Sequence, residues 1–236
     1  MIIESKEIID ILKHANQDAL VLFDIDNTLI WAEQEFGSLE WGTYVADRFH
    51  KKGFDPREAF QKSYEIYRKI EEIIAYEPVE EMTLHVLNNL NKEGIKNIAL
   101  TRRLFSSSDA TEKHLLSAGI DFSKNLLHKN DVVLNEEAAY FNGVLYSGFE
   151  EEKGCCLIKF LEEISYKPQS IIFVDDTKNH IEEFHETVSA YGISTTCIRY
   201  GWADSRSDNF DPVRAEKDMK NFVGQDRFDA LFKELL

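Results

Sequence analysis

The sequence predicts an α/β fold in which a parallel β-sheet is flanked by helices. Short apolar runs of strand length recur along the 236 residues, and helical patterns lie between them. The first run, VLF at residues 21–23, is apolar without alternation, as in a strand covered on both faces. Because strands that alternate with helices form parallel sheets, these observations together define the predicted fold class.

The chain begins with a segment of mixed character. Residues 1–17, MIIESKEIIDILKHANQ, carry acidic residues among the apolar ones and have no basic start. This pattern predicts an amphipathic helix and not a signal peptide. The first predicted strand follows at 19–24, ALVLFD. No apolar run reaches the roughly 18 residues of a membrane span, so we expect a cytoplasmic protein without a transmembrane segment.

A long helical insertion follows the first strand. No strand pattern occurs between residues 31 and 92, where the segments are helix-like. Ligands of open α/β sheets bind beyond the carboxyl ends of the strands, and the insertion leaves from that edge. We therefore predict a helical cap domain at 33–90 and a core domain formed by 1–32 and 91–236.

Aromatic residues are concentrated at the start of the insertion, at Trp31, Phe36, Trp41 and Tyr44. They pack the cap against the core, since aromatic side chains dominate core burial, or they line a pocket for an aromatic leaving group. The sequence leaves both alternatives open.

The rest of the chain alternates strands with helices. Strands are predicted at 96–101, 170–176 and 193–200, and helices at 107–119, 153–164 and 177–192. Alternating residues around Asn142-Gly143 predict a β-hairpin instead. These elements complete a parallel sheet with a local antiparallel addition.

Composition narrows the class of partner. The formal net charge of −16 argues against nucleic acid and against anionic membrane surfaces, which both select for Lys and Arg. The three cysteines, Cys155, Cys156 and Cys197, form no C-x-x-C pair. This sparse, odd number indicates a reducing compartment without a disulfide framework.

Two aspartates end the first strand, in the segment DIDNT at residues 24–28. Asp, Asn and Thr are common in turns, so a turn is one explanation of Asp24 and Asp26. The other is a metal and phosphate site, because two neighbouring carboxylates are costly unless a cation compensates them. Their partners further along the chain decide between the two explanations.

Polar residues also mark the ends of two later strands. Thr101 follows the run NIAL, and Asp175 and Asp176 follow SIIFV, while Lys153 begins a helix. Each alone has an ordinary explanation as a cap, a turn or a surface residue. In one parallel sheet, however, the strand ends meet at the same edge. The two aspartates would then offer hard oxygen ligands suited to Mg²⁺.

This set of residues matches the needs of phosphoryl transfer, which are a nucleophile, an acid for the leaving oxygen and positive charge for the phosphate. Asp24 is suited to be the nucleophile that forms an aspartyl-phosphate, and Asp26 to be the acid. Thr101 is suited to hold a phosphate oxygen. Lys153 would offset the negative charge of Asp24 and of the phosphate.

With these residues the chain resembles the haloacid dehalogenase (HAD) superfamily. DIDNT matches its first motif, Thr101 the second, Lys153 the third and VDD at 174–176 the fourth. The resemblance covers nearly the whole chain outside the insertion. It implies a HAD-like Rossmannoid parallel sheet with a helical cap, and Mg²⁺ as the cofactor. The implied metal set is Asp24, Asp26 through its backbone carbonyl, Asp175 and Asp176.

A narrower set of segments is similar to domain-of-unknown-function family 2608, a HAD group found largely in bacteria that live inside eukaryotic cells. The segments are FDIDNTL, FGSLEW, IALTRR, NGVLYSGFEEEKG and IIFVDD. Some such proteins are delivered into hosts, so translocation into a host cell is a second expectation for location. One departure concerns His180, which stands where some HAD members have a second acid.

The resemblance implies a Mg²⁺-dependent phosphatase, since dehalogenases lack an acid at the position of Asp26. The expected substrate is a phosphate monoester on a small molecule or a phosphoprotein, with phosphotyrosine or another aryl phosphate as one class. Arg102, or its neighbour Arg103, would bind a second anionic group of the substrate; the alternative is that both are solvated surface arginines. The alternatives are a phosphomutase and a catalytically silent domain that binds a phosphorylated ligand or a host protein.

Overall fold

The computed structural model describes residues 1–235. The chain forms two compact units, each built from two separate stretches of sequence. The sheet unit comprises Met1–Ile30 and Pro78–Asp204, and the helical unit comprises Trp31–Glu77 and Ser205–Leu236. Each unit is described by itself.

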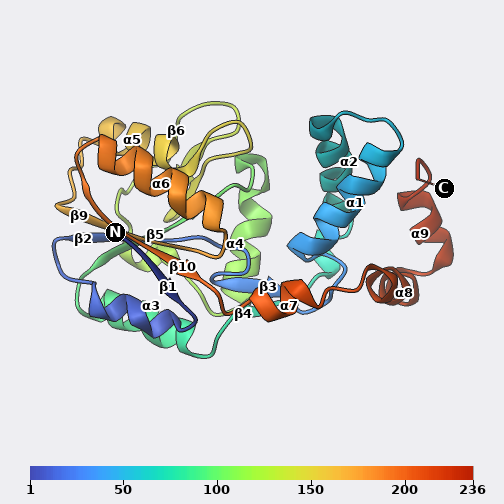
Figure 1. The fold of residues 1–236 in the computed structure, drawn as a ribbon, viewed down its shortest axis with the longest axis horizontal. Coiled ribbons are helices and arrows are strands. Elements are labelled where there is room, and N and C mark those ends of the chain that lie inside the picture. The colour runs from blue at the N-terminus through green and yellow to red at the C-terminus, as the bar shows by residue number, and fades with distance from the viewer. Residues whose placement is uncertain (236) are drawn as a thin grey trace. The chain divides into compact units, whose positions relative to one another are not determined.

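The sheet unit contains an eight-stranded sheet in the order β1-β10-β9-β2-β5-β8-β7-β6 (Figure 1). The six strands from β1 to β8 in this order are parallel, and the pairs β8–β7 and β7–β6 are antiparallel. The strands are β1 Ile2–Ser5, β2 Ala19–Phe23, β5 Lys96–Thr101, β6 Val132–Val133, β7 Ala139–Phe141, β8 Val144–Tyr146, β9 Ser170–Asp175 and β10 Ser194–Tyr200. This confirms the predicted α/β class.

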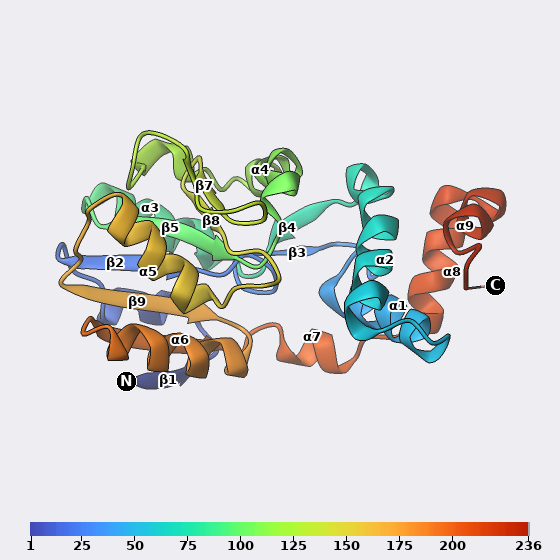
Figure 2. The ribbon, with the colours of Figure 1, turned by 90° about the horizontal axis from the view of Figure 1, so that it is seen from above.

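Helices cover both faces of the sheet. The α-helices are α3 Met82–Lys92, α4 Ser108–Ser117, α5 Lys153–Glu163 and α6 Lys178–Ala190, and short 3₁₀ helices are η1 Ile8–Lys13, η3 Phe105–Ser107 and η4 Phe122–Asn125. Helices α5 and α6 lie on one face, and α3 with η1 lies on the other (Figures 1 and 2). The core strands are therefore apolar on consecutive residues, as the run at 21–23 predicted.

Alternate residues of each central strand face the two helical layers. Leu22 of β2 and Phe173 of β9 pack in one cluster with Phe160 of α5 and Phe184 of α6. The neighbouring residue Phe23 is equally buried. Burying such side chains supplies about 1.5–3 kcal/mol each, and this core fixes the strand ends that carry the polar residues.

The N-terminal segment differs from the prediction of one amphipathic helix. Ile2–Ser5 forms the edge strand β1, which pairs in parallel with β10, and only Ile8–Lys13 is helical. Strand β2, the first predicted strand, is thus second in the chain. The predicted hairpin is confirmed: β7 and β8 are joined by Asn142 and Gly143, both at positive φ.

The helical unit is built from the insertion and the last part of the chain. Its helices are α1 Leu39–Lys51, α2 Pro56–Arg68, η2 Glu71–Ile73, α8 Pro212–Val223 and α9 Gln225–Leu231, while α7 Asp204–Asp208 begins at its boundary. The short strands β3 Ile30–Ala32 and β4 Tyr76–Pro78 pair where the chain enters and leaves it. The sequence pattern contained no sign of these three-residue strands.

The helix starts of this unit follow the local sequence closely. Ser38, Asp55 and Asp211 are N-caps whose side chains accept hydrogen bonds from the first-turn backbone N–H groups. Proline follows both aspartates at the first helical position, where its missing N–H costs nothing. These caps therefore define where α1, α2 and α8 begin.

Aromatic side chains form the core of the helical unit. Trp41 is fully buried and meets the ring of Phe232 edge-on, with 6.3 Å between ring centroids. Phe36 is also buried and contacts Phe222. For Phe36 and Trp41, the packing role is within this unit. Trp31 is half-exposed, and the Arg206 guanidinium lies over its ring.

The compact units divide the chain differently from the expected domain boundaries. Helix α3, expected in part within the cap, packs on η1 and β5 in the sheet unit. Residues 205–236, expected in the core, contribute α8 and α9 to the helical unit. Both differences arise from long-range packing, which local hydrophobic patterns do not encode.

Candidate active site

The candidate site lies at the carboxyl end of β2, between its neighbours β5 and β9. Phe23, the last residue of β2, pairs with Ala99 on one side and with Val174 on the other. The backbone N–H of Asp24 still donates to the carbonyl of Val174, at 2.8 Å. This register places Asp24 beside the next residue of β9, Asp175, so that two carboxylates meet at one edge of the sheet.

A tight turn follows Asp24 and returns the chain towards β3. The backbone N–H groups of Leu29 and Ile30 both donate to the carbonyl of Ile25, and Asn27 adopts a positive φ of 59°. Thr28 is fully buried, and its hydroxyl accepts a hydrogen bond from the backbone N–H of Asp176 at 3.1 Å. The turn is therefore fastened to the end of β9.

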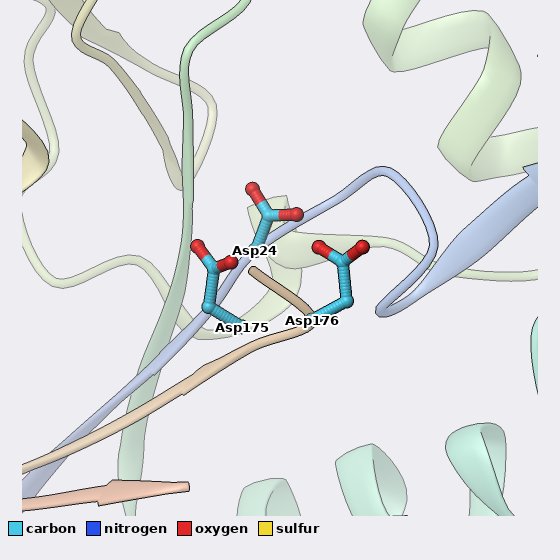
Figure 3. Close-up of side chains that lie close together, drawn as sticks. All are labelled: Asp24, Asp175 and Asp176. Carbon is cyan, nitrogen blue, oxygen red and sulfur yellow. The ribbon is translucent and has the colours of Figure 1, made fainter. Parts of the chain in front are cut away.

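Three carboxylates gather at this edge. Asp24, Asp175 and Asp176 each offer an oxygen atom within 4.8 Å of the others, and Figure 3 shows them coming from the ends of β2 and β9. Lys153, the first residue of α5, donates to Asp24 and, at 2.6 Å, to Asp175. One ammonium group therefore forms ion pairs with two of the three carboxylates, and the cluster keeps an excess of negative charge.

Asp175 is held by protein donors on both oxygens. Lys153 bonds one oxygen, while the other accepts from the Thr177 backbone N–H at 2.8 Å and lies 3.3 Å from His180 Nδ1. Burial acts to raise the pKa of Asp175, but the Lys153 charge and the His180 contact outweigh it and lower the pKa. The lowered pKa favours the charged form of Asp175, and the donors on both oxygens fix the orientation of its carboxylate.

Asp24 and Asp176 are less well compensated. Burial, with the neighbouring carboxylates, raises the pKa of Asp24 to about 7 despite Lys153, and raises the pKa of Asp176 to about 8. A raised carboxyl pKa means that the charged form lacks stabilising positive charge. Hard oxygen ligands with unmet negative charge are the donor set that Mg²⁺ prefers, so these residues fit a divalent cation.

The carboxylate of Asp26 lies outside this cluster, in contact with Arg103. Both of its oxygens accept from the Arg103 guanidinium, at 2.9 and 2.6 Å. Burial acts to raise the pKa of Asp26, but the Arg103 charge and hydrogen bonds lower it. The side chain of Asp26 is therefore no member of the three-carboxylate group. Metal binding by its backbone carbonyl, which the family resemblance implies, stays a prediction.

Thr101 and Arg102, at the end of β5, each have a hydrogen-bond partner within the protein. Thr101 ends β5, is buried, and its hydroxyl accepts from the Arg103 backbone N–H at 3.2 Å. Arg102 donates to the carbonyl of Phe149 at 2.5 Å, and its expected role in substrate binding stays a prediction. The neighbouring Arg103 is the arginine whose side chain binds Asp26.

Sequence reasoning gave no firm role to three residues at this edge, Arg103, Thr28 and His180. For Arg103 the signal was present, since two arginines follow Thr101 and either could bind an anionic group. Thr28 lay within the matched motif DIDNT but was not given a separate role. His180 was noted only as a departure, and its contact with Asp175 depends on the first turn of α6.

A Chlamydia pneumoniae protein named "Putative outer membrane protein" is 24% identical over 182 residues, which are 76% of this chain and 68% of that protein. Among residues 1–235, no helix has the length and apolar character that crossing a membrane requires.

Solved structures with a similar chain course include two hydrolases. A haloacid dehalogenase-like family protein from Streptococcus pneumoniae has a TM-score of 0.45 and 14% identity, over 75% of this chain and 92% of its own. A HAD-superfamily hydrolase from Geobacter sulfurreducens has a TM-score of 0.44 and 14% identity, over 80% of this chain and 95% of its own. The family described as "Protein of unknown function (DUF2608)" matches residues 2–225, and the chain belongs to this family.

Proposed function

We propose that this protein is a Mg²⁺-dependent phosphatase that hydrolyses phosphate monoesters through an aspartyl-phosphate. One observation carries the proposal: a buried aspartate at the end of the central strand β2 shares a cluster with two further carboxylates and a buried lysine. Asp24 is the nucleophile in this proposal. A desolvated carboxylate that neighbouring charges hold in place is well suited to attack phosphorus.

The reaction has two steps. Asp26 is ionised beside Arg103 in the free protein, and it takes up a proton in the substrate complex, where the negative charge of the phosphate lies beside it. In the first step, an oxygen of Asp24 forms a bond to phosphorus while the bond from phosphorus to the ester oxygen breaks, and the protonated Asp26 delivers its proton to the departing oxygen. In the second, water attacks the phosphorus, the bond to Asp24 breaks, and Asp26 takes up a proton from that water. Inorganic phosphate leaves, and both aspartates return to their starting state.

Positive charge at the site supports both steps. Lys153 offsets the charge of Asp24 as the phosphate approaches, and Thr101 contributes its hydroxyl to a phosphate oxygen. Asp24, Asp175 and Asp176 would hold Mg²⁺, which when bound supplies further charge for the phosphate oxygens. Substrate selection by the inserted helical segment 33–90, with aryl phosphates such as phosphotyrosine as one class, stays a prediction.

The test is an assay of p-nitrophenyl phosphate with and without Mg²⁺. We expect Mg²⁺-dependent release of nitrophenol, and a loss of about 10³-fold or more in kcat for Asp24→Asn, because the near-isosteric amide is a poor nucleophile. Asp55→Asn is the matched control, since it makes the same chemical change at the N-cap of α2. Both variants should keep the wild-type circular dichroism spectrum.

Mass spectrometry after acid quenching identifies the intermediate. The wild-type peptide that contains Asp24 should gain one phosphoryl group during turnover. Stoichiometric inorganic phosphate, without a second phosphorylated product, separates a phosphatase from a phosphomutase. Retention of wild-type, Mg²⁺-dependent activity by Asp24→Asn would exclude the covalent mechanism.

A further inference from the structure

We propose that Arg103 is a positioning residue that holds the Asp26 carboxylate in the orientation needed for proton transfer to the leaving oxygen. The inference rests on the proposed phosphatase function and concerns a residue outside the motifs that suggested it. It predicts that Arg103 matters in proportion to how much the leaving group needs a proton.

The contact between the two side chains is bidentate. Arg103 Nε donates to Asp26 Oδ2 at 2.9 Å, and Nη2 donates to Oδ1 at 2.6 Å. A planar guanidinium that binds both oxygens fixes the plane of the carboxylate, which a single hydrogen bond does not do. Each carboxylate oxygen has two lone pairs, so this bidentate contact leaves one lone pair on each oxygen that can bind the transferred proton.

The guanidinium is itself held by α4. Its Nη1 donates to the Thr111 hydroxyl at 3.2 Å and lies 3.3 Å from His114 Nδ1. Thr111 and His114 are one helical turn apart, and both are buried. The packing of α4 sets the positions of Thr111 and His114. Through them the guanidinium of Arg103, and with it the carboxylate of Asp26, is held in place relative to α4.

The backbone of Arg103 adds a second link to the site. Its N–H donates to the hydroxyl of Thr101, the residue proposed to hold a phosphate oxygen, at 3.2 Å. Asp26 lies in the turn after β2, where its backbone forms an isolated bridge with Ile30, and its carboxylate accepts its hydrogen bonds from Arg103. The acid therefore depends on a side-chain partner for its orientation. Small errors in the placement of reacting groups cost large factors in rate.

The experiment measures kcat and KM for a series of aryl phosphates whose phenols differ in acidity. The variants are Arg103→Met, which removes the grip, and Arg103→Lys, which keeps the charge but binds at a single point. We expect Arg103→Met to lower kcat by about 10–100-fold for the least acidic phenol and by less than about threefold for nitrophenol. Arg103→Lys should lie between Arg103→Met and the wild type.

Two further variants isolate the mechanism. In the Asp26→Asn background, Arg103→Met should cause no additional loss, because the residue it positions is already disabled. Arg214→Met is the matched control: Arg214 also binds a carboxylate with two nitrogens, that of Glu35, but at the surface of the helical unit. It should leave the whole series unchanged.

Three outcomes would overturn the inference. These are an equal loss across the series, a rise in KM as the main effect, and a loss that persists in the Asp26→Asn background; the first two indicate that Arg103 binds the substrate directly. If Arg103→Met fails to fold, Arg103→Lys decides the question by the same criteria. A wild-type protein inactive on the whole series would instead refute the proposed phosphatase function.

Discussion

The two units of this protein differ in where their paired charged side chains lie. In the sheet unit, Asp24, Lys153 and Asp175 are buried at the end of the sheet, and Lys153 donates to both aspartates. In the helical unit, pairs such as Lys62–Glu234 and Arg214–Glu35 each include a partner with more than half of its side chain exposed. The core of that unit is made of aromatic and aliphatic side chains.

This difference indicates which part of the protein carries a cost in the free energy of folding. Exposed ion pairs contribute about 0–1 kcal/mol to stability, and they require little desolvation. Buried charges require desolvation, which mutual attraction only partly repays. A unit that gathers three carboxylates, two of them buried, beside one lysine is less stable than one with an apolar core there, so folding alone does not explain the cluster. The following predictions test this contrast, from the largest expected effect to the smallest.

Trp41→Ala should destabilise the helical unit by about 3–5 kcal/mol, because it removes a large, fully buried side chain from an apolar core. Hydrogen exchange measured by mass spectrometry localises the effect. Amides of α1, α2 and α8 should lose protection far more than those of β2 and β9. Equal loss in both units would show that the two do not unfold as separate cooperative bodies.

Lys153→Met should lower the free energy of unfolding by about 3 kcal/mol at pH 8, since it leaves buried carboxylates without their cation. The loss should be smaller at pH 5, where Asp24 and Asp176 bind protons instead. Lys62→Met in the helical unit is the control and should cost less than about 1 kcal/mol. Chemical denaturation at the two pH values provides the measurement, and a loss independent of pH contradicts the prediction.

Mg²⁺ should stabilise the protein by about 2.7 kcal/mol at a concentration 100 times its Kd at pH 8. Asp24 and Asp176 have pKa values near 7 and 8 in the folded state, above the ordinary 3.8. Without metal, their contribution to stability is therefore present below pH 4 and is lost as the pH rises through 7–8. The cation binds the ionised forms, so its effect should grow over the same range.

Thermal unfolding with and without Mg²⁺ at pH 5 and pH 8 measures this dependence. The shift in Tm should be several-fold larger at pH 8, and Asp176→Asn should remove most of it. A shift of the same size at both pH values would mean that Mg²⁺ binds outside the carboxylate cluster.

Asp211→Ala should have the smallest effect, about 1 kcal/mol, because it removes the N-cap of α8. Asp211→Asn should be nearly neutral, since asparagine caps equally well. Neither variant should alter the response to Mg²⁺, which distinguishes an aspartate that caps a helix from one that serves the site. Urea denaturation resolves a difference of this size.

The parts of the molecule that the sequence predicted correctly depend on local pattern. Strands such as Lys96–Thr101 were bounded correctly because they are short apolar runs between turn residues. Once the sheet is parallel, the residues that follow its strands share one edge, and this is why Asp24 and Asp175 could be placed together.

The parts that were missed depend on partners distant in sequence. Ile2–Ser5 became a strand because β10 offers it a free edge, although its own pattern favoured a helix. Arg102 and Arg103 are adjacent and chemically identical, and the turn after β5 decides which one reaches Asp26. Residues 205–236 joined the helical unit through contacts such as that of Phe232 with Trp41.

The interleaving of the two units has a consequence for how the protein is made. A ribosome releases residues 31–77 early, but α8 and α9, which complete their core, emerge only after the whole sheet unit. The apolar surface of Trp41 and its neighbours therefore stays exposed to solvent while the rest of the sheet unit is synthesised. During this interval the protein is most exposed to aggregation and to proteases, and chaperones that shield apolar segments would have most effect.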